Sequence, residues 1–187
     1  MKEYTIKAIP TMYNGVQFRS RLEATWAAFF DLCGWDWDYE PIDFNGWIPD
    51  FVIHGGIDVY VEVKPFTTRE EFEYYDVVKK IEDTKIDKDI LLLGVRPFGD
   101  DNDSNDTSEP SIGWILEYED HDLFSFSNSY FNGAIFVFNT KYDFVPSSHW
   151  MSDREGLLYS KNVHGDNADP LPLWKQAKNI TQWNKKH

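Results

Sequence analysis

Three carboxylates and one lysine are spaced in this chain so that they could bind a divalent metal ion. Pro49-Asp50 is followed by Glu62-Val63-Lys64 at the end of a β-branched run, and Glu23 lies upstream in a helical pattern. Carboxylate oxygens are the ligands that hard cations such as Mg²⁺ prefer. An ammonium group can offset the charge of a phosphate. These residue types therefore favour metal-assisted hydrolysis of a phosphodiester bond.

An acid-x-Lys triplet arises readily in a chain with 32 acidic and 18 basic residues, so its context decides its meaning. Asp83-Thr84-Lys85 follows a helical pattern and is typical of a solvated helix end. Glu62-Val63-Lys64 instead ends the alternating segment 57–64, which predicts a half-buried strand. Side chains two residues apart share one face of a strand, so Glu62 and Lys64 are expected to point the same way.

The turn before this strand decides whether Asp50 and Glu62 can meet. Residues 50–54 predict a second short strand, and Gly55-Gly56 predicts a hairpin between the two. A two-residue loop would pair Asp50 with Val61, whereas a three-residue loop would pair it with Glu62. A slip of one residue moves side chains to the other face of a sheet. We predict the three-residue, bulged turn, because it also gathers the apolar side chains of both strands on one face.

Glu23 lies in the segment 19–34, whose apolar residues recur at helical spacing. Its position at the margin of the apolar face would let its side chain point inward. A purely structural role is equally open, because Ser20-x-x-Glu23 matches a capping box, in which the Glu side chain caps its own helix. The downstream Asp50 and Glu62 favour a role in a metal site.

The order of a helical Glu, then Pro-Asp, then Glu-x-Lys on the next strand resembles the PD-(D/E)xK nuclease superfamily. This group includes restriction endonucleases, Holliday-junction resolvases, phage exonucleases and transposon end-cleaving nucleases. The resemblance covers roughly residues 15–95, and the tail segment 174–183 is also similar to the ends of such proteins. The stretches that carry it are 18–27, 39–41, 49–51 and 61–65.

The resemblance implies a Mg²⁺- or Mn²⁺-dependent deoxyribonuclease with an α/β, restriction-endonuclease-like core: a mixed central β-sheet flanked by helices. Asp50 and Glu62 would bind the metal with the main-chain carbonyl of Val63, and Glu23 would complete the shell directly or through water. Lys64 would orient the attacking water or help to deprotonate it, while the metal lowers the pKa of that water. The implied catalytic set is Glu23, Asp50, Glu62 and Lys64.

The charge of the chain is the main argument against this interpretation. Its formal net charge is −14, the wrong sign for a protein that approaches DNA, because nucleic-acid affinity comes largely from Lys and Arg. The segment 99–140 contains nine acids and no Lys or Arg, which leaves −5 for the other residues. Arg19 and Arg21, beside Glu23, are the best candidates for contacts with DNA phosphates.

A helix and a second strand follow the strand that carries Glu62-Val63-Lys64. Thr68-x-x-Glu71 is a capping box that opens a helical pattern, and the apolar run 90–95 is short enough to be a buried strand. This order predicts a parallel crossover and an α/β core. Further elements are predicted as strands over 112–118 and 134–139 and as a terminal helix over 172–183.

We expect a single PD-(D/E)xK-like domain over residues 1–187, because this length leaves little room for a second one. Its core would span 15–98, an exposed acidic loop 99–111, and later strands and a helix 112–187. No apolar run is long enough for a membrane span, and no leader sequence is evident. With a single cysteine in addition, we expect a cytoplasmic protein of a bacterium or a phage-infected host.

Aromatic residues are unusually frequent, with eight Trp, ten Tyr and fourteen Phe. Most are expected in the core, since aromatic side chains bury the largest apolar areas. Trp35, Trp37 and Trp47 precede Pro49-Asp50, and they could instead stack on nucleobases.

Two functions from different classes agree with the sequence. The first is a metal-dependent DNA nuclease of a phage or mobile element that acts on DNA ends, on branches or on a strand delivered by a protein partner. Because cutting both strands usually needs two sites, a homodimer is one expectation. The second is an acidic inhibitor or DNA mimic that binds a nucleic-acid-processing complex without cleaving. The intact set of Glu23, Asp50, Glu62 and Lys64 favours the first, and the acidic segment favours the second.

Overall fold

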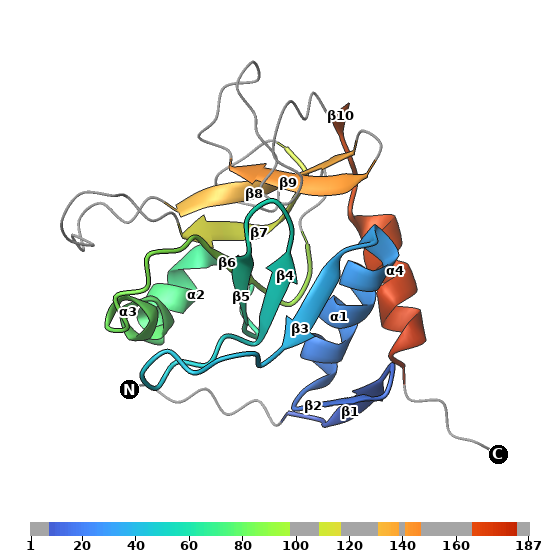
Figure 1. Cartoon of the computed structure of the whole chain (residues 1–187). Helices are drawn as coiled ribbons and strands as arrows, with labels where there is room; N and C mark the ends of the chain where they lie inside the picture. The colour runs from blue at the N-terminus through green and yellow to red at the C-terminus, as the bar shows by residue number, and fades with distance from the viewer. Residues whose placement is uncertain (1–7, 98–108, 117–130, 139–140, 147–165, 183–187) are drawn as a thin grey trace.

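The computed structural model describes residues 8–97, 109–116, 131–138, 141–146 and 166–182. Figure 1 shows the arrangement of its helices and strands. The helices are α1 (Arg21–Cys33), α2 (Arg69–Tyr74), α3 (Val77–Glu82) and α4 (Leu171–Ile180). The strands are β1 (Thr11–Tyr13), β2 (Val16–Phe18), β3 (Asp36–Tyr39), β4 (Phe51–His54), β5 (Val59–Val63), β6 (Ile90–Leu93), β7 (Ser111–Leu116), β8 (Phe131–Phe138), β9 (Tyr142–Pro146) and β10 (Asp166–Asn167).

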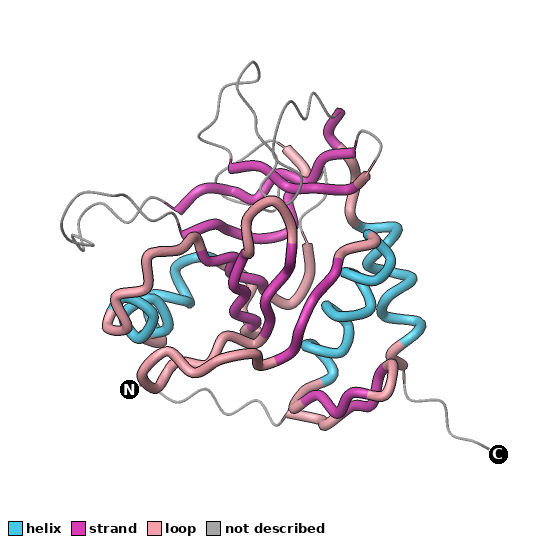
Figure 2. Tube along the Cα trace, in the orientation of Figure 1, coloured by secondary structure: helices cyan, strands magenta, loops and turns pink. Residues whose placement is uncertain are grey.

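A mixed β-sheet with helices against it confirms the expected α/β architecture (Figure 2). The strands of this sheet are paired in the order β10-β8-β7-β6-β5-β4-β3, and β9 pairs with β8. The strands β5 and β6 are parallel, whereas β4 is antiparallel to both of its neighbours, β3 and β5. The parallel crossover predicted after the motif is therefore present. The strands β1 and β2 form a small sheet of their own.

Both faces of the sheet are buried. On one face, α1 and α4 lie side by side (Figure 1), with the ring centroids of Trp26 and Trp174 4.4 Å apart. Leu91 and Leu93 of β6 belong to the apolar cluster beneath these helices, whereas Leu92 belongs to a second cluster with α2 and α3. The apolar run at β6 is therefore a central strand that is covered on both sides, as predicted.

The register between β4 and β5 is the one predicted by the three-residue loop. Phe51 pairs with Val61 and Ile53 pairs with Val59, so the same register places Asp50, directly before β4, opposite Glu62. The predicted bulge is wrong, because these pairs follow one another without a shift and neither glycine of the turn has a positive φ.

Helix α1 begins and ends as its sequence predicts. Ser20 is the N-cap, and its side chain accepts a hydrogen bond from the amide of Glu23. Gly34 adopts a left-handed φ of 73°, which glycine does without steric cost, and its amide donates to the carbonyl of Asp31. The start of this helix, and therefore the position of Glu23, is set by local sequence.

The single helical pattern after Thr68 forms two short helices, α2 and α3, which is a correction. The chain breaks at Asp76, whose φ of 58° lies in the left-handed region that short polar residues tolerate. Periodicity did not reveal the break, because Phe72 and Ile81 still reach the same apolar cluster on either side of it.

The later predictions are met where the chain is described. The segment 112–118 corresponds to β7, 134–139 to β8 and 172–183 to α4, each shifted by one to three residues at its ends. The acidic loop over 99–111 lies outside the described residues up to residue 108. Among the described residues, no helix has both the length and the apolar character needed to cross a lipid bilayer.

The packing of α1 against the sheet can be tested with Trp26→Phe. The Trp26 indole is fully buried and donates from Nε1 to the carbonyl of Gly94 at 2.9 Å. Its loss leaves a buried acceptor without this donor, so we expect the free energy of unfolding to fall by about 1–3 kcal/mol or more. Trp37→Phe is the matched control, because that indole donates to the exposed carboxylate of Asp31. Urea unfolding should show a clearly smaller loss for Trp37→Phe, and equal losses would contradict this packing.

Candidate active site

Asp50 is held at the end of the connection between β3 and β4. Only 6% of its surface is exposed, and its Oδ2 accepts a hydrogen bond from the amide of Val63 at 2.8 Å. This contact ties the residue that precedes β4 to the last residue of β5. The carboxylate of Asp50 is therefore positioned by the hairpin backbone itself.

Glu62 is equally buried, with 6% of its surface exposed, and its two oxygens have different partners. Oε2 accepts a hydrogen bond from the indole Nε1 of Trp47 at 2.9 Å. Oε1 lies 2.5 Å from the Nζ of Lys64. Buried carboxylates are costly unless they are paired and hydrogen-bonded, and Glu62 is both.

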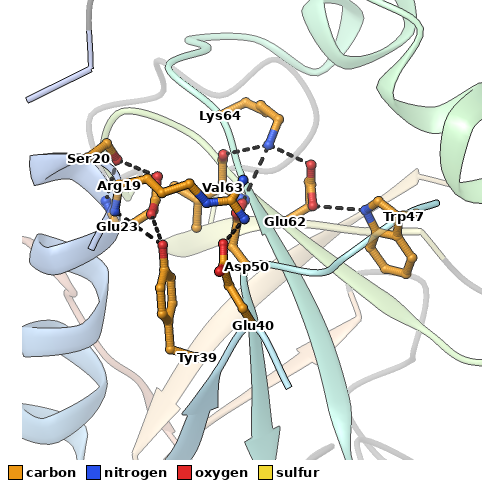
Figure 3. Close-up of polar contacts among 10 residues, drawn as sticks. All are labelled: Arg19, Ser20, Glu23, Tyr39, Glu40, Trp47, Asp50, Glu62, Val63 and Lys64. Carbon is orange, nitrogen blue, oxygen red and sulfur yellow. Dashed lines mark hydrogen bonds and ion pairs between the residues drawn. The ribbon is translucent and has the colours of Figure 1, made fainter. Parts of the chain in front are cut away.

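The ammonium group of Lys64 is shared by three oxygen atoms (Figure 3). Its Nζ lies 2.5 Å from Oε1 of Glu62, 3.4 Å from Oδ2 of Asp50 and 3.0 Å from the main-chain oxygen of Val63. These are three of the four residues that the family resemblance nominates as metal ligands; the fourth is Glu23. The structure thus brings Asp50, Glu62, Val63 and Lys64 together around one positive charge.

The same three oxygens fit a hard divalent cation, because each is an oxygen donor and all three already contact a single cationic group. They comprise two carboxylates and one main-chain carbonyl. In the described part of the chain, no three His, Cys, Asp or Glu side chains converge closely enough to hold a metal by themselves. A bound Mg²⁺ or Mn²⁺ would therefore rely on the carbonyl of Val63 and on water.

Glu23 lies on the same cleft but has partners of its own. Its Oε1 accepts from the hydroxyl of Ser20 at 2.6 Å, and its Oε2 accepts from the hydroxyl of Tyr39 at 2.6 Å. The two interpretations of Ser20-x-x-Glu23 are thus combined: Ser20 caps the helix, and the Glu23 carboxylate contacts the Ser20 hydroxyl at the helix start while it also lines the cleft.

A cleft of about 350 Å³ joins these residues. Glu23, Asp50, Val63 and Lys64 line it, and so do Arg19, Arg21 and the start of α1; the other lining residues are Ala8, Ile9, Ser20, Leu22 and Pro65. Both nominated arginines are therefore placed beside the carboxylates. Glu62 is not among the lining residues; its side chain lies between the Lys64 ammonium and Trp47 (Figure 3).

Arg19 is largely exposed, and its guanidinium forms an ion pair with Glu40. Its main-chain amide donates to the hydroxyl of Tyr39 at 3.2 Å. Arg21 is exposed in the first turn of α1. The two side chains bring positive charge to the mouth of the cleft, next to the N-terminus of a helix, which itself favours anions.

Burial raises the pKa of two residues in this region. For Glu62, burial outweighs the opposing Lys64 charge, and the nearby Asp50 adds to the rise. For Tyr39, burial and the hydrogen bond to Glu23 raise the pKa to about 12, so its hydroxyl stays protonated and remains a donor.

Sequence reasoning missed two residues that shape the site. Tyr39 holds Glu23, and alternation along β3 could have found it, since Trp37 and Tyr39 share the face towards α1. Trp47 holds Glu62, whereas it was proposed to stack on nucleobases. That proposal is wrong for Trp35 and Trp47, which are 3% and 1% exposed and have their indole donors engaged inside the protein.

A scan against protein-family models, a search of curated proteins and a search of solved structures each found no match for this chain. What the site can do is therefore inferred from its own geometry.

A divalent cation that binds the three oxygens must displace the ammonium of Lys64. Lys64→Met removes the competing charge and keeps an aliphatic side chain at the site. We therefore expect Mn²⁺ to bind the variant about tenfold more tightly than the wild type, or better, as measured by calorimetry. The exposed Lys79→Met on α3 is the control and should leave the affinity unchanged. Weaker binding by Lys64→Met would contradict a shared cation position.

Glu62 should make the stability of the metal-free protein depend on pH. Burial raises its pKa above the ordinary value of 4.5, so the folded state binds this proton more tightly than the unfolded chain. Its contribution to the free energy of unfolding is present below about pH 4.5 and is lost as the pH rises through the raised pKa of Glu62 in the folded state. Urea unfolding at a series of pH values should show wild-type stability falling relative to Glu62→Gln over this window.

Glu71→Gln is a matched control, for which we expect the free energy of unfolding to change with pH in the opposite direction. Burial acts against ionisation of Glu71, but the amides of Thr67 and Thr68 donate to its carboxylate and hold its pKa below 4.5. Its contribution to the free energy of unfolding is present above about pH 4.5 and is lost as the pH falls through the lowered pKa of Glu71 in the folded state. If stability changed with pH in the same direction for both variants, the burial assigned to Glu62 and the amide hydrogen bonds assigned to Glu71 could not explain their pKa shifts.

Proposed function

We propose that this protein is a metal-dependent nuclease that hydrolyses phosphodiester bonds in DNA, with Mg²⁺ or Mn²⁺ as its cofactor. The observation that carries the proposal is the single cation position shared by Asp50, Glu62 and the main-chain oxygen of Val63, where the Lys64 ammonium lies. Two buried carboxylates and a carbonyl that converge on one positive charge have the donor chemistry of a Mg²⁺ site.

The architecture around the site supports the same proposal. The mixed sheet, with β5 and β6 parallel and helices on both faces, agrees with the restriction-endonuclease-like core implied by the sequence resemblance. The register of β4 and β5 brings the Pro-Asp and Glu-x-Lys parts of the motif side by side. These features make the motif a spatial arrangement as well as a sequence pattern.

The residues of the cleft have distinct roles in such a reaction. A bound divalent ion would supply Lewis acidity and lower the pKa of a water molecule. Lys64, once displaced from the three oxygens, remains beside the cleft, where its ammonium can orient water or offset phosphate charge. Arg19 and Arg21 can bind the phosphates on either side of the scissile bond. Glu23 would hold water from the wall formed by α1.

The net charge of −14 weakens the proposal less than it first suggests. Charges are screened over about 8–10 Å at physiological ionic strength, so the residues that line the cleft affect a bound phosphate more than remote acids do. Three of those residues are basic: Arg19, Arg21 and Lys64. A protein partner that delivers the DNA strand, or a homodimer with two sites, would add further binding surface. We place this activity in the cytoplasm of a bacterial or phage-infected cell.

The acid-rich segment favours a second candidate, an inhibitor or DNA mimic that binds a nucleic-acid-processing complex without cleaving. Of its nine acids only Glu109 lies in the described part of the chain. The buried pairing of Asp50, Glu62 and Lys64 has no evident use in a mimic, whose acids need to be exposed. We therefore favour the nuclease.

Cleavage assays with matched variants test the proposal. Single-stranded, duplex and branched DNA, and RNA, are incubated with the protein in Mg²⁺ and in Mn²⁺. We expect DNA cleavage by the wild type, none above the metal-free background for Asp50→Asn, and a rate about 10²–10³-fold lower for Lys64→Met, which loses a donor to developing charge. Denaturing gels give the rate and the product ends.

The controls are Asp36→Asn and Lys79→Met, which make the same chemical changes at exposed positions on β3 and α3. Both should cut at the wild-type rate. An absence of cleavage under every condition, or equal cleavage by Asp50→Asn, would sink the nuclease proposal. Competition between an inactive wild type and DNA for a nucleic-acid-binding enzyme would then support the mimic.

A further inference from the structure

We propose that Trp47 is a positioning residue that fixes the Glu62 carboxylate for cation binding and couples it to Asp50. The inference rests on the proposed function, because it concerns the same site. Its basis is the hydrogen bond of 2.9 Å from the indole Nε1 of Trp47 to Oε2 of Glu62, visible at the edge of the site in Figure 3.

Trp47 is held rigidly by a tight turn in the connection between β3 and β4. Phe44 and Trp47 form an isolated antiparallel bridge, with hydrogen bonds of 2.8 and 3.2 Å between their main chains. Gly46 has a φ of 100°, which an L-residue with a side chain rarely adopts, and its amide donates to the carboxylate of Asp43. The rings of Phe44 and Trp47 stack with centroids 5.9 Å apart. The indole therefore approaches Glu62 from a fixed direction.

The chemistry of the indole suits this role. Its N–H can only donate, so it requires an acceptor and holds Oε2 of Glu62 as an unprotonated oxygen. Oε1 is then the oxygen that faces the cation position, 2.5 Å from Nζ of Lys64. The indole offsets part of the cost of burying the carboxylate. Because it is neutral, it does not compete with a bound cation for the negative charge of Glu62, whereas a lysine or arginine in its place would.

Trp47 also links the two acidic residues through the chain. It lies three residues before Asp50, in the same connection, and only 1% of its surface is exposed. Its side chain packs in the apolar cluster that contains Leu92 and Trp114 of the sheet. The hydrogen bond to Glu62 thus fastens the segment that delivers Asp50 to the strand that delivers Glu62. Outer partners of this kind tune a metal site through its ligands.

The test is Trp47→Phe, which keeps an aromatic ring and removes only the donor and part of the volume. Mn²⁺ and Mg²⁺ affinities are measured by calorimetry on the full chain. We expect binding to weaken about 10–100-fold, the effect typical of losing an outer hydrogen-bond partner of a metal ligand. Circular dichroism and urea unfolding report whether the variant is folded under the conditions of the titration.

Trp35→Phe is the matched control. Trp35 is also buried, with 3% of its surface exposed, and its Nε1 also donates inside the protein, to the main-chain oxygen of Tyr142 at 2.8 Å. It has no contact with Glu62. The variant should bind metal like the wild type even though it loses a buried hydrogen bond of the same kind.

A second measurement on the unmodified protein does not depend on the folding of any variant. The indole N–H resonances of Trp47 and Trp35 are assigned in the ¹⁵N–¹H spectrum of the wild type from nuclear Overhauser contacts. Addition of Mg²⁺ should shift the Trp47 resonance, because the charge on its acceptor is drawn to the cation, while the Trp35 indole resonance should stay in place. A merely structural tryptophan would not respond in this way.

The outcomes separate this inference from the proposed function. Weaker binding by folded Trp47→Phe, together with a responsive indole, supports the positioning role. Binding within about twofold of the wild type, or an indole that Mg²⁺ does not shift, overturns the role and leaves the nuclease proposal intact. A wild type that binds neither Mg²⁺ nor Mn²⁺ overturns both.

Discussion

The antiparallel register between β4 and β5 is the constraint on which the candidate site depends. Phe51 pairs with Val61, and Asp50 consequently lies opposite Glu62. The same pairing puts Phe51 and Val61 into the apolar cluster under α1. A slip of one residue would separate the two acids and also turn the apolar side chains away from that cluster. Hydrophobic burial therefore stabilises the register that the site requires, and the hydrogen bond from the Val63 amide to the Asp50 carboxylate adds to it.

Two acids buried side by side would normally repel each other and destabilise the fold. Here the Lys64 ammonium lies between Asp50 and Glu62, and the Trp47 indole donates to the oxygen of Glu62 that the lysine does not reach. The Lys64 ammonium offsets this repulsion, and it lies at the position where we propose that a divalent ion binds. Under that proposal, folding and cation binding use the same oxygens.

Much of this arrangement is predictable from local sequence. Alternation identified β5, and the choice between a two- and a three-residue loop set the register that the structure confirms. The caps at Ser20 and Gly34 defined α1, and the apolar run after Ile90 identified the central strand. The break at Asp76 was not predictable, because helical periodicity continues across it. The indole of Trp47 and the hydroxyl of Tyr39 were missed as well, since each contacts an acid on another element, 15 and 16 residues away along the chain.

The sequence by itself determined which acids and which lysine share a strand face, where α1 begins, and that a parallel crossover follows the motif. These are consequences of short-range periodicity and of caps that act within one helical turn. Only the tertiary structure decided that Glu23 is held by Tyr39, that Trp47 is buried against Glu62, and that Lys64 is shared by three oxygens. Such contacts depend on how α1, the sheet and the connection before β4 pack together, and no pattern within one segment records that packing.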